Sequence, residues 1–333
     1  MSSRDPLVSF VVPCYNYGRY VAECLASIFR QDARDDFEVI AIDDGSTDDT
    51  RDVLRSNQDP RLRVIIHQRN LGHIHTVNEG LAAARGAFIA RIDPDDRYRP
   101  WFLTSALGKF REYPEVGFVY GDVALIDDCG KVNLERCDRT HQGADFKGNE
   151  FVPLLGENFI CAATTIARRE AWHKVLPIPA GLAFNDWYLN IMMARTHDFY
   201  YIDRVLADYR VHPANHHAKV VRDKTEEISI FWLLDKVYGE KEDSECLEQA
   251  KLRARGRIYA AQYLTLAEKY FGFYMNEDAL RCYWSAARMR PWCMLSPGVL
   301  RRCAATVVGR GWYEAGKKIL KRHSLSGWVD YDV

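Results

Sequence analysis

The sequence has no apolar run long enough to cross a membrane. An uninterrupted stretch of about 18 apolar residues, the minimum for a spanning helix, does not occur. The apolar segment at 7–12 is also too short for the core of a secretion signal. These absences lead us to expect a protein that is soluble or lies on a membrane surface.

Paired cysteines and a strong net charge are missing as well. The nine cysteines are an odd number and include no Cys-x-x-Cys pair, which argues against a disulfide framework and a structural zinc site and favours a reducing cytoplasm. The 45 basic and 46 acidic residues leave a net charge of −1, so no overall field attracts nucleic acid. We therefore expect no nucleic-acid partner, and any anion site must be local.

Two common nucleotide-binding signatures are also absent. The first apolar segment is not followed by Gly-x-Gly-x-x-Gly, and Gly-x-x-x-x-Gly-Lys-Ser/Thr does not occur. The segment ends instead in Pro13, Cys14, Tyr15 and Asn16. A dinucleotide-binding fold, a P-loop and the glycine-rich phosphate loop of a nucleotidyltransferase therefore have no support.

The first hundred residues alternate between strand-like and helix-like patterns. Short β-branched and aromatic runs of the kind that fill buried strands lie at 7–12, 37–42, 62–66 and 88–92. Apolar stripes at helical spacing lie at 20–29 and 74–84, and Ser46 with Asp49 resembles a capping box for a helix that carries Val53 and Leu54. This alternation predicts a mainly parallel sheet covered on both faces.

The alternation weakens after Trp101 and ends after Val220. We expect a helix to about Tyr113, a loop over 127–149, a helix over 186–195, and strands at 116–120, at 160–167 and, as one or two short pieces, at 199–209. The remainder is rich in Ala, Leu, Tyr, Lys and Arg at helical spacing. The sequence thus predicts two domains, an α/β domain at 1–220 and an all-helical extension at 221–333.

Two predicted strands run directly into carboxylates. Asp43 and Asp44 end the second strand before Gly45, and Asp93, Asp95 and Asp96 follow the fourth. Ligands bind beyond the carboxyl ends of strands in open parallel sheets. Three clustered carboxylates repel one another unless a cation lies among them, and oxygen ligands suit Mn²⁺ or Mg²⁺. The alternatives are an Asp-Gly turn capped by Ser46 and a solvated acidic turn containing Pro94.

Two later segments are more ambiguous. Asp186 precedes a helix that carries Leu189, and it is either a functional carboxylate or the N-cap of that helix. The segment 208–217 is basic and rich in histidine, so Arg210 could bind phosphate and His212 a metal, although histidines in a surface loop are usually just solvated.

Four motifs, taken in order and with their intervals, resemble the family-2 glycosyltransferases with a GT-A fold. They are Val11-Val12-Pro13-Cys14-Tyr15-Asn16, Ile42-Asp43-Asp44-Gly45-Ser46-Thr47-Asp48, Asn70-Leu71-Gly72 and Ile92-Asp93-Pro94-Asp95-Asp96. The resemblance covers about residues 7 to 215. It implies an α/β GT-A fold with a Rossmann-like mixed sheet, followed by an all-helical C-terminal extension.

The resemblance also implies roles for single residues. Pro13 and Tyr15 would line the nucleotide pocket, and Asp44 would accept hydrogen bonds from the base. Asp93 would lie near the ribose and Asp95 on the metal, with Asp96 as a supporting neighbour. Asp186 matches the general base, while Tyr209, Arg210 and His212 resemble the segment that closes over the donor diphosphate. We take Arg210 as a donor contact and His212 as a second metal ligand.

The function implied is an inverting glycosyltransferase, of the hexosyltransferase type, that depends on Mn²⁺ or Mg²⁺. It would move a sugar from a nucleotide diphosphate donor, commonly a UDP-sugar, to a hydroxyl of a glycan or lipid-linked acceptor in cell-surface polysaccharide synthesis. Asn185, where Glu is usual, and Val77, where Arg is frequent, depart from the pattern. They are the only support for the alternative, a non-catalytic nucleotide-sugar-binding or scaffold protein.

The tail carries one further pattern. Val299, Cys303, Val307, Trp312, Ala315 and Ile319 lie at helical spacing among Arg301, Arg302, Arg310, Lys317, Lys318, Lys321 and Arg322. A basic amphipathic helix of this kind can lie on an anionic membrane surface, although packing against its own domain is an equal alternative. We therefore expect a cytoplasmic protein, with peripheral contact at the inner face of the cell membrane as a possibility to test.

Overall fold

The computed structural model describes residues 5–33, 36–137, 141, 143–212 and 217–308. The chain folds as two compact units, Met1–His216 and His217–Val333. This division lies a few residues before the one expected at 220/221. Among the described helices, none has both the length and the apolar character that a membrane span needs.

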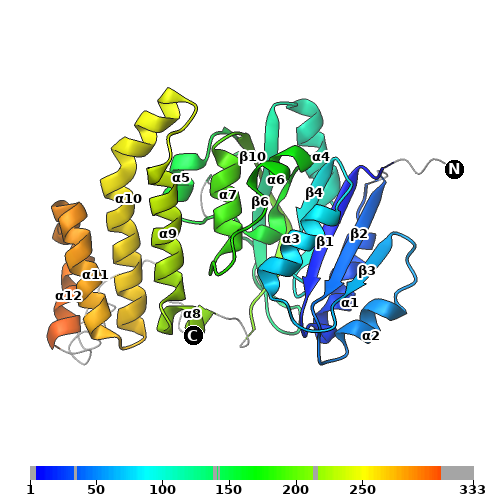
Figure 1. Cartoon of the computed structure of the whole chain (residues 1–333), viewed down its shortest axis with the longest axis horizontal. Coiled ribbons are helices and arrows are strands. Elements are labelled where there is room, and N and C mark those ends of the chain that lie inside the picture. Colours follow the sequence, from blue (N-terminus) through cyan, green and yellow to red (C-terminus); the bar gives the residue numbers. More distant parts are fainter. Residues whose placement is uncertain (1–4, 34–35, 138–140, 142, 213–216, 309–333) are drawn as a thin grey trace. The chain divides into compact units, whose positions relative to one another are not determined.

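The first unit is built on one mixed sheet of ten strands within the described residues (Figure 1). The strand order is β3-β2-β1-β4-β9-β6-β10-β5, with β7 beside β6 and β8 beside β10. The strands are β1 Val8–Cys14, β2 Phe37–Asp43, β3 Leu62–Ile66, β4 Phe88–Arg91, β5 Arg97–Tyr98, β6 Val116–Ile126, β7 Val132–Leu134, β8 Phe146–Gly148, β9 Ile166–Arg168 and β10 Asp198–Arg210.

Helices of the first unit cover both faces of this sheet. They are α1 Gly18–Phe29, α2 Thr50–Ser56, α3 His73–Ala83, α4 Phe102–Glu112, α5 Phe151–Gly156, the 3₁₀ turn η1 Ala162–Thr164, α6 Arg169–Val175 and α7 Asn185–Ala194. Phe10 of β1 packs in a core that includes residues of α1 and α4. Its neighbour Val11 points to the other face, where a side chain at Gly80 of α3 would collide with it. The predicted alternation of strands and helices is therefore confirmed, with both faces buried.

Three predicted elements need correction. The predicted strand at 160–167 begins only at Ile166 and is preceded by the turn η1, because the hydroxyls of Thr164 and Thr165 donate to the carbonyls of Cys161 and Ala162 and bend the chain (2.9 and 2.8 Å). The predicted loop at 127–149 contains the short strands β7 and β8.

The third correction concerns the end of the sheet. The segment predicted as one or two short strands is one strand, β10, which agrees with the first alternative but is 13 residues long, with irregular pairing to β6 between Ile202 and Ala207. The polar residues Asp203 and Arg204 interrupt the apolar pattern there, and they made one strand resemble two.

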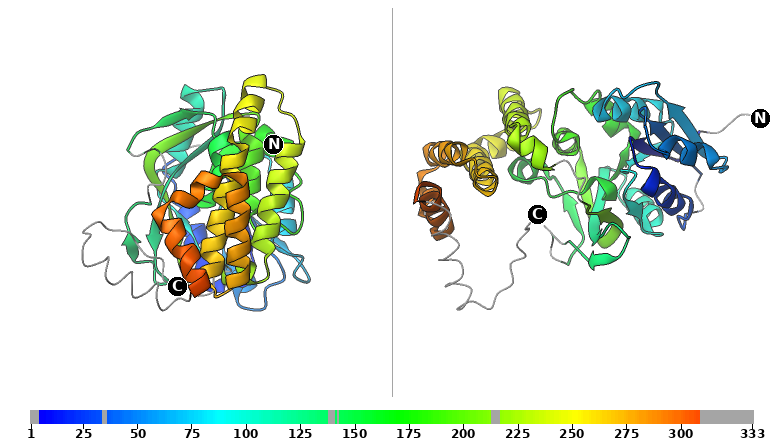
Figure 2. Two further views of the ribbon diagram at one scale, coloured as in Figure 1. Left: turned by 90° about the vertical axis from the view of Figure 1, so that its left-hand side faces the viewer. Right: turned by 90° about the horizontal axis from the view of Figure 1, so that it is seen from below.

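The second unit is all-helical in its described residues. Its elements are α8 His217–Arg222, α9 Thr225–Gly239, α10 Glu245–Gly272, α11 Asn276–Met289, the 3₁₀ turn η2 Pro291–Leu295 and α12 Pro297–Val308. Figure 2 (right) shows α10, α11 and α12 packed side by side. Lys251 of α10 is fully buried and is paired with Glu242 (3.0 Å) and Glu248 (2.8 Å).

Candidate active site

The sheet topology brings the predicted site residues to one edge. Strands β1, β2 and β4 run parallel, and β6 and β10 share their direction because β9 pairs antiparallel with both β4 and β6. The carboxyl ends of β1, β2, β4 and β10 therefore meet at the same edge. The segments around Tyr15, Asp44, Asp93 and His212 all follow these strand ends.

The loops after β1 and β2 are fastened to each other by side-chain to backbone hydrogen bonds. The Ser46 hydroxyl accepts from the backbone N–H of Asn16 (3.0 Å), and Asn16 Oδ1 accepts from that of Thr47 (2.8 Å). Asp48 accepts from the N–H of Gly18, the first residue of α1 (3.0 Å). The predicted capping box at Ser46 is wrong, because α2 begins at Thr50 and Ser46 instead connects the two loops. Pro13 is buried in β1, and Tyr15 is 42% exposed beside this joint.

Asp43 and Asp44 have different environments. Asp43 is fully buried and accepts from the N–H of Ser46 (3.0 Å) and from Arg51 Nε (2.9 Å), so it closes the turn. Asp44 is 2% exposed; it accepts from the N–H groups of Leu71 and Gly72 (2.8 and 2.9 Å) and pairs with His67. Burial raises the pKa of Asp44, but these hydrogen bonds outweigh that effect and lower it.

Gly45 is required at this turn for two reasons. Its φ of +70° lies in the left-handed region, and a Cβ there would come within 2.4 Å of the Arg69 carbonyl carbon. The Asp-Gly pair therefore packs directly against the segment that leads to Leu71 and Gly72.

Asp93, Asp95 and Asp96 form a carboxylate cluster after β4. Asp95 is 9% exposed and lies 3.0 Å from His212 Nε2, and these are the two residues predicted as metal ligands. Asp96 accepts from the backbone N–H of Arg210 (2.8 Å). Asp93 Oδ1 is buried and has no hydrogen-bond partner among the described residues.

The electrostatics of this cluster favour a bound cation. Burial raises the pKa of Asp95, and Asp93 adds to the rise while His212 opposes it. Burial and the charges of Asp95 and Asp93 also raise the pKa of Asp96. Burial and the neighbouring carboxylates thus both disfavour the charged forms of Asp95 and Asp96, and a divalent ion would offset both effects. Carboxylate oxygens suit Mn²⁺ or Mg²⁺, so the three carboxylates present suit the predicted ion.

Arg210 lies behind this cluster. Its side chain is 2% exposed, and its guanidinium donates to the backbone carbonyls of Asp95 (2.8 Å) and Asp127 (3.1 Å) and to Glu23 (2.6 Å). A direct contact with donor phosphates would require these bonds to break. The geometry therefore does not favour the predicted phosphate contact, and Arg210 instead holds the acidic loop against β10.

Arg91, the last residue of β4, connects the two halves of the site. It is 4% exposed, donates to Asn185 Oδ1 (2.8 Å) and lies 3.5 Å from Asp93 Oδ2. Asn185, which departs from the family pattern, is thus a buried partner of Arg91. Val77, the second departure, is fully buried in α3.

Asp186 lies in the first turn of α7, after the N-cap residue Phe184, which has no side-chain cap bond. Its Oδ2 accepts from Asn158 Nδ2 (2.9 Å), which leaves the other oxygen of the carboxylate for a further partner. Asn190, one helical turn along α7, donates to Asn158 Oδ1 (3.3 Å). Asp186 is therefore not the helix N-cap, and two asparagines orient it. Sequence analysis missed both, although the i, i+4 spacing of Asp186 and Asn190 places them on one helix face.

His73 is a further residue that the motifs did not single out. It opens α3 directly after Asn70-Leu71-Gly72. Its side chain is exposed, and the charges of Arg91, Asp93 and Asp186 act on it. The electrostatic influence of both carboxylates makes His73 a further candidate residue of this site. Burial raises the pKa of Tyr17, and the charges of Asp95 and Asp93 raise it further.

Comparison with known proteins identifies the family of the chain. Residues 9–176 match the family described as Glycosyl transferase family 2. The chain is 30% identical over 237 residues to an uncharacterized glycosyltransferase of Nostoc sp., covering 66% of this chain and 69% of that protein. It is 36% identical over 131 residues to the chondroitin synthase of Escherichia coli, covering 39% of this chain and 19% of that protein. The chain belongs to glycosyltransferase family 2, and it is a glycosyltransferase.

Solved structures confirm the predicted GT-A fold. TarS of S. aureus in complex with UDP-GlcNAc has a TM-score of 0.60 at 17% identity, covering 90% of this chain and 79% of that one. The mannosyltransferase PcManGT of Pyrobaculum calidifontis, in complex with GDP-Man and Mn²⁺, has a TM-score of 0.61 at 18% identity, covering 97% and 82%. Identities this low establish the fold and not the substrate.

Proposed function

We propose that this glycosyltransferase moves a sugar from a UDP-sugar to an acceptor hydroxyl with inversion at the anomeric carbon. One observation carries the proposal: Arg91 joins the carboxylate cluster to the start of α7. Arg91 contacts Asp93, which belongs to the cluster beside His212, and it also contacts Asn185, the residue before Asp186. This arrangement supports a donor site and a base site side by side. It argues against the scaffold alternative, because Asp93, Asp95 and Asp186 are all retained.

On the donor side, Asp95 and His212 would hold Mn²⁺ or Mg²⁺. The ion would supply positive charge to the leaving diphosphate. Asp93 would contact the ribose, and Pro13 and Tyr15 would line the nucleotide pocket. Asp44 already accepts hydrogen bonds from Leu71 and Gly72, so a base contact through it would have to share oxygens that are in use.

On the acceptor side, Asp186 would act as general base. Its carboxylate would take the proton of the acceptor hydroxyl while that oxygen attacks the anomeric carbon and the bond from that carbon to the diphosphate oxygen breaks. Attack from the face opposite the leaving group inverts the configuration, so no covalent sugar-enzyme intermediate is needed. Asn158 and Asn190 would keep Asp186 aimed at the hydroxyl.

The donor nucleotide and the acceptor are the finer parts of the proposal. UDP is supported by the TarS complex with UDP-GlcNAc, whereas the mannosyltransferase complex contains GDP-Man. A panel of UDP- and GDP-sugars tested for Mn²⁺-dependent thermal stabilisation separates them, because a bound donor raises the melting temperature. We propose a glycan or lipid-linked acceptor in polysaccharide synthesis at the cytoplasmic face of the membrane, since the name of the E. coli relative describes a polysaccharide synthase.

Asp186→Asn tests the catalytic base. The change keeps the size and the partner Asn158 but removes the ability to accept a proton, so turnover should fall about 10²- to 10⁴-fold while donor affinity hardly changes. Turnover is measured as nucleotide diphosphate release with a competent acceptor. The matched control is Asp59→Asn, because Asp59 precedes β3 and so lies at the opposite edge of the sheet, where it pairs with Arg61. Near-wild-type turnover in Asp186→Asn would exclude Asp186 as the general base and leave it a structural residue of α7.

A further inference from the structure

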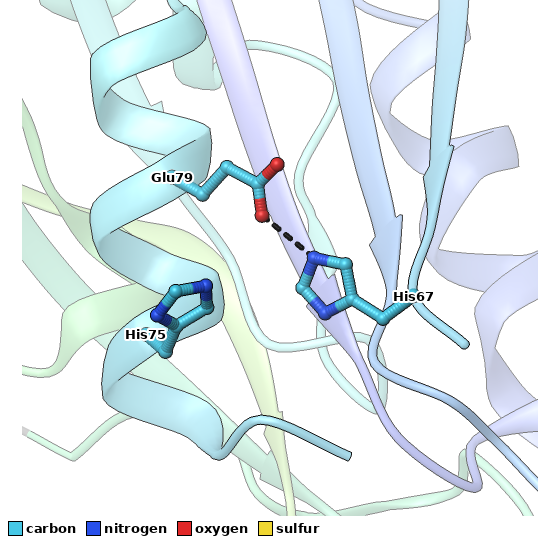
Figure 3. A group of neighbouring side chains, drawn as sticks. All are labelled: His67, His75 and Glu79. Atoms are coloured by element: carbon cyan, nitrogen blue, oxygen red, sulfur yellow. Dashed lines mark hydrogen bonds and ion pairs between the residues drawn. The ribbon is translucent and has the colours of Figure 1, made fainter. Parts of the chain in front are cut away.

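A second group of potential metal ligands lies between β3 and α3. His67 follows the last residue of β3, and its backbone N–H donates to the Asp43 carbonyl (2.9 Å). His75 and Glu79 lie one turn apart on α3, on the face toward His67 (Figure 3). None of these residues belongs to the carboxylate cluster after β4.

The spacing of the ligand atoms suits a small metal ion. One atom from each of His67, His75 and Glu79 lies within 4.8 Å of the other two. Ligands about 2.0–2.2 Å from a tetrahedral zinc ion are about 3.4 Å apart, so small side-chain rotations would complete the geometry. His67 is buried, Glu79 is half-buried and His75 is exposed, which leaves a path from solvent to the group.

A buried carboxylate fixes the orientation of the central histidine. His67 Nδ1 lies 2.7 Å from Asp44 Oδ1, and Asp44 is itself held by the N–H groups of Leu71 and Gly72. With Nδ1–H donating to Asp44, the His67 Nε2 points toward Glu79 Oε2 at 2.6 Å. Histidine ligands of zinc typically donate their other ring N–H to such an outer carboxylate.

We propose that His67, His75 and Glu79 form a zinc site, with Asp44 as the outer carboxylate. The metal takes the place of the proton that His67 and Glu79 share, and water or a small ligand completes the coordination. Two imidazoles and one carboxylate suit Zn²⁺, Ni²⁺ or Cu²⁺, whereas Mg²⁺ prefers oxygen ligands. The site is separate from Asp95 and His212, so the proposal does not depend on the proposed function.

The arrangement has an alternative in which no metal takes part. His67 held between Asp44 and Glu79 can simply be an imidazolium that bonds two carboxylates. That interpretation gives His75 no role, because an exposed histidine adds nothing to the pair. His75 is therefore the residue that separates the two interpretations.

The test is zinc binding to the full chain after chelator treatment and dialysis. Titration with ZnCl₂ against a chromogenic chelator should give one zinc ion per chain. His75→Ala should weaken zinc binding at least about 100-fold, more than the loss of an outer partner typically does. It should leave circular dichroism and the melting temperature in chelator unchanged, because the side chain is exposed and Ala favours a helix.

Two histidine variants serve as controls. His73→Ala removes another exposed histidine two positions away on α3, and His212→Ala removes the histidine beside Asp95. Both should keep the zinc ion. Unchanged zinc affinity in His75→Ala, or loss of zinc in His212→Ala, would overturn the proposal, the second result by assigning the ion to the donor site. Excess Mn²⁺ should not displace the zinc. Displacement by Mn²⁺ would also assign the ion to the donor site and overturn the proposal.

Discussion

Individual carboxylates at the site differ in function because their surroundings differ. Asp43 accepts hydrogen bonds from the Arg51 guanidinium and from a backbone N–H of the turn. Asp95, by contrast, pairs with one imidazole and lies beside two other carboxylates. The pKa of Asp95 is therefore raised, first by burial and then by the charge of Asp93. Both residues follow buried strands and look alike in the sequence.

Asp95→Ala should abolish the effect of Mn²⁺ or Mg²⁺ on donor binding without unfolding the protein. Removing one of three mutually repelling carboxylates relieves strain in the loop, so the melting temperature without metal should not fall. Nucleotide-sugar binding is measured by calorimetry with and without Mn²⁺. His212→Ala should weaken the metal effect in the same direction, and an Asp95→Ala protein with unchanged metal dependence would contradict the assignment.

The candidate site was predictable where chemistry is local. Strand ends followed by Asp-Pro-Asp-Asp or Asp-Asp-Gly identify their positions without further knowledge. Arg210 was not predictable, because its burial depends on Glu23 and on the loop at Asp127, both remote in sequence. His73 was missed because one exposed histidine at a helix start carries no pattern of its own.

At the level of elements, a buried glutamate connects the amino-terminal ends of β1 and β2 with the segment before β4. These ends lie at the sheet edge away from the site. Glu38 of β2 accepts from the Ser9 hydroxyl of β1 (2.7 Å) and from the guanidinium of Arg85, between α3 and β4 (2.7 Å). The Ser9 hydroxyl in turn accepts from the Gly86 N–H (2.8 Å). A Cβ on Gly86 would come within 2.5 Å of the Ser9 nitrogen, so this connection also requires glycine.

Glu38→Gln should lower the free energy of unfolding by about 1–2 kcal/mol near neutral pH, within the range for hydrogen bonds to charged groups and discounted for the half-exposed Arg85. Burial raises the pKa of Glu38, but the bonds from Arg85 and Ser9 outweigh it and lower the pKa. A lowered folded-state pKa gives stability that is present above the unfolded value of about 4.3 and is lost as the pH falls.

Urea unfolding at several pH values checks this sign. The difference between wild type and Glu38→Gln should be constant from about pH 8 to about pH 5.5 and should shrink below about pH 4.5. A difference that grows toward acid would mean that Glu38 is not stabilised in its charged form.

The elements themselves were predictable to different degrees. Strands β1 to β4 and helices α1 and α3 could be predicted from the spacing of apolar residues alone, because both faces of the sheet are covered. The strand β9 was placed too early because Thr164 and Thr165 read as β-formers, whereas their hydroxyls bond back to the chain. The strands β7 and β8 were missed for a different reason, because they exist through pairing partners that the local sequence does not show.

At the scale of the whole molecule, the family match ends before the helical unit begins. The match covers 9–176, whereas α8 to α12 lie beyond 216. This unit has its own buried ion pairs around Lys251 and a connection from Arg281 to Glu227 (2.6 Å). Its role is therefore a separate question from the catalytic chemistry of the first unit.

The described start of the predicted basic helix packs within its own unit. Val299 is 5% exposed in α12, and Arg302 pairs with Glu268 of α10. Val307, predicted on the same apolar face, is 69% exposed, so the face is divided. The remaining residues of the pattern, from Arg310 to Arg322, lie outside the described residues.

Membrane contact by the tail is tested with a full-length chain in which Arg310, Lys317, Lys318, Lys321 and Arg322 are replaced by Gln. Each basic side chain near an anionic surface contributes about 1 kcal/mol, so vesicle binding should fall at least about 100-fold if these residues carry it. Flotation with vesicles that contain anionic lipid is compared with neutral vesicles, and the effect should disappear at high salt because the attraction is screened. The described helix α12 is untouched by these replacements, so a loss cannot come from unpacking Val299. Equal flotation of the wild-type and substituted chains would exclude the tail as a membrane anchor and would leave packing within the helical unit as its role.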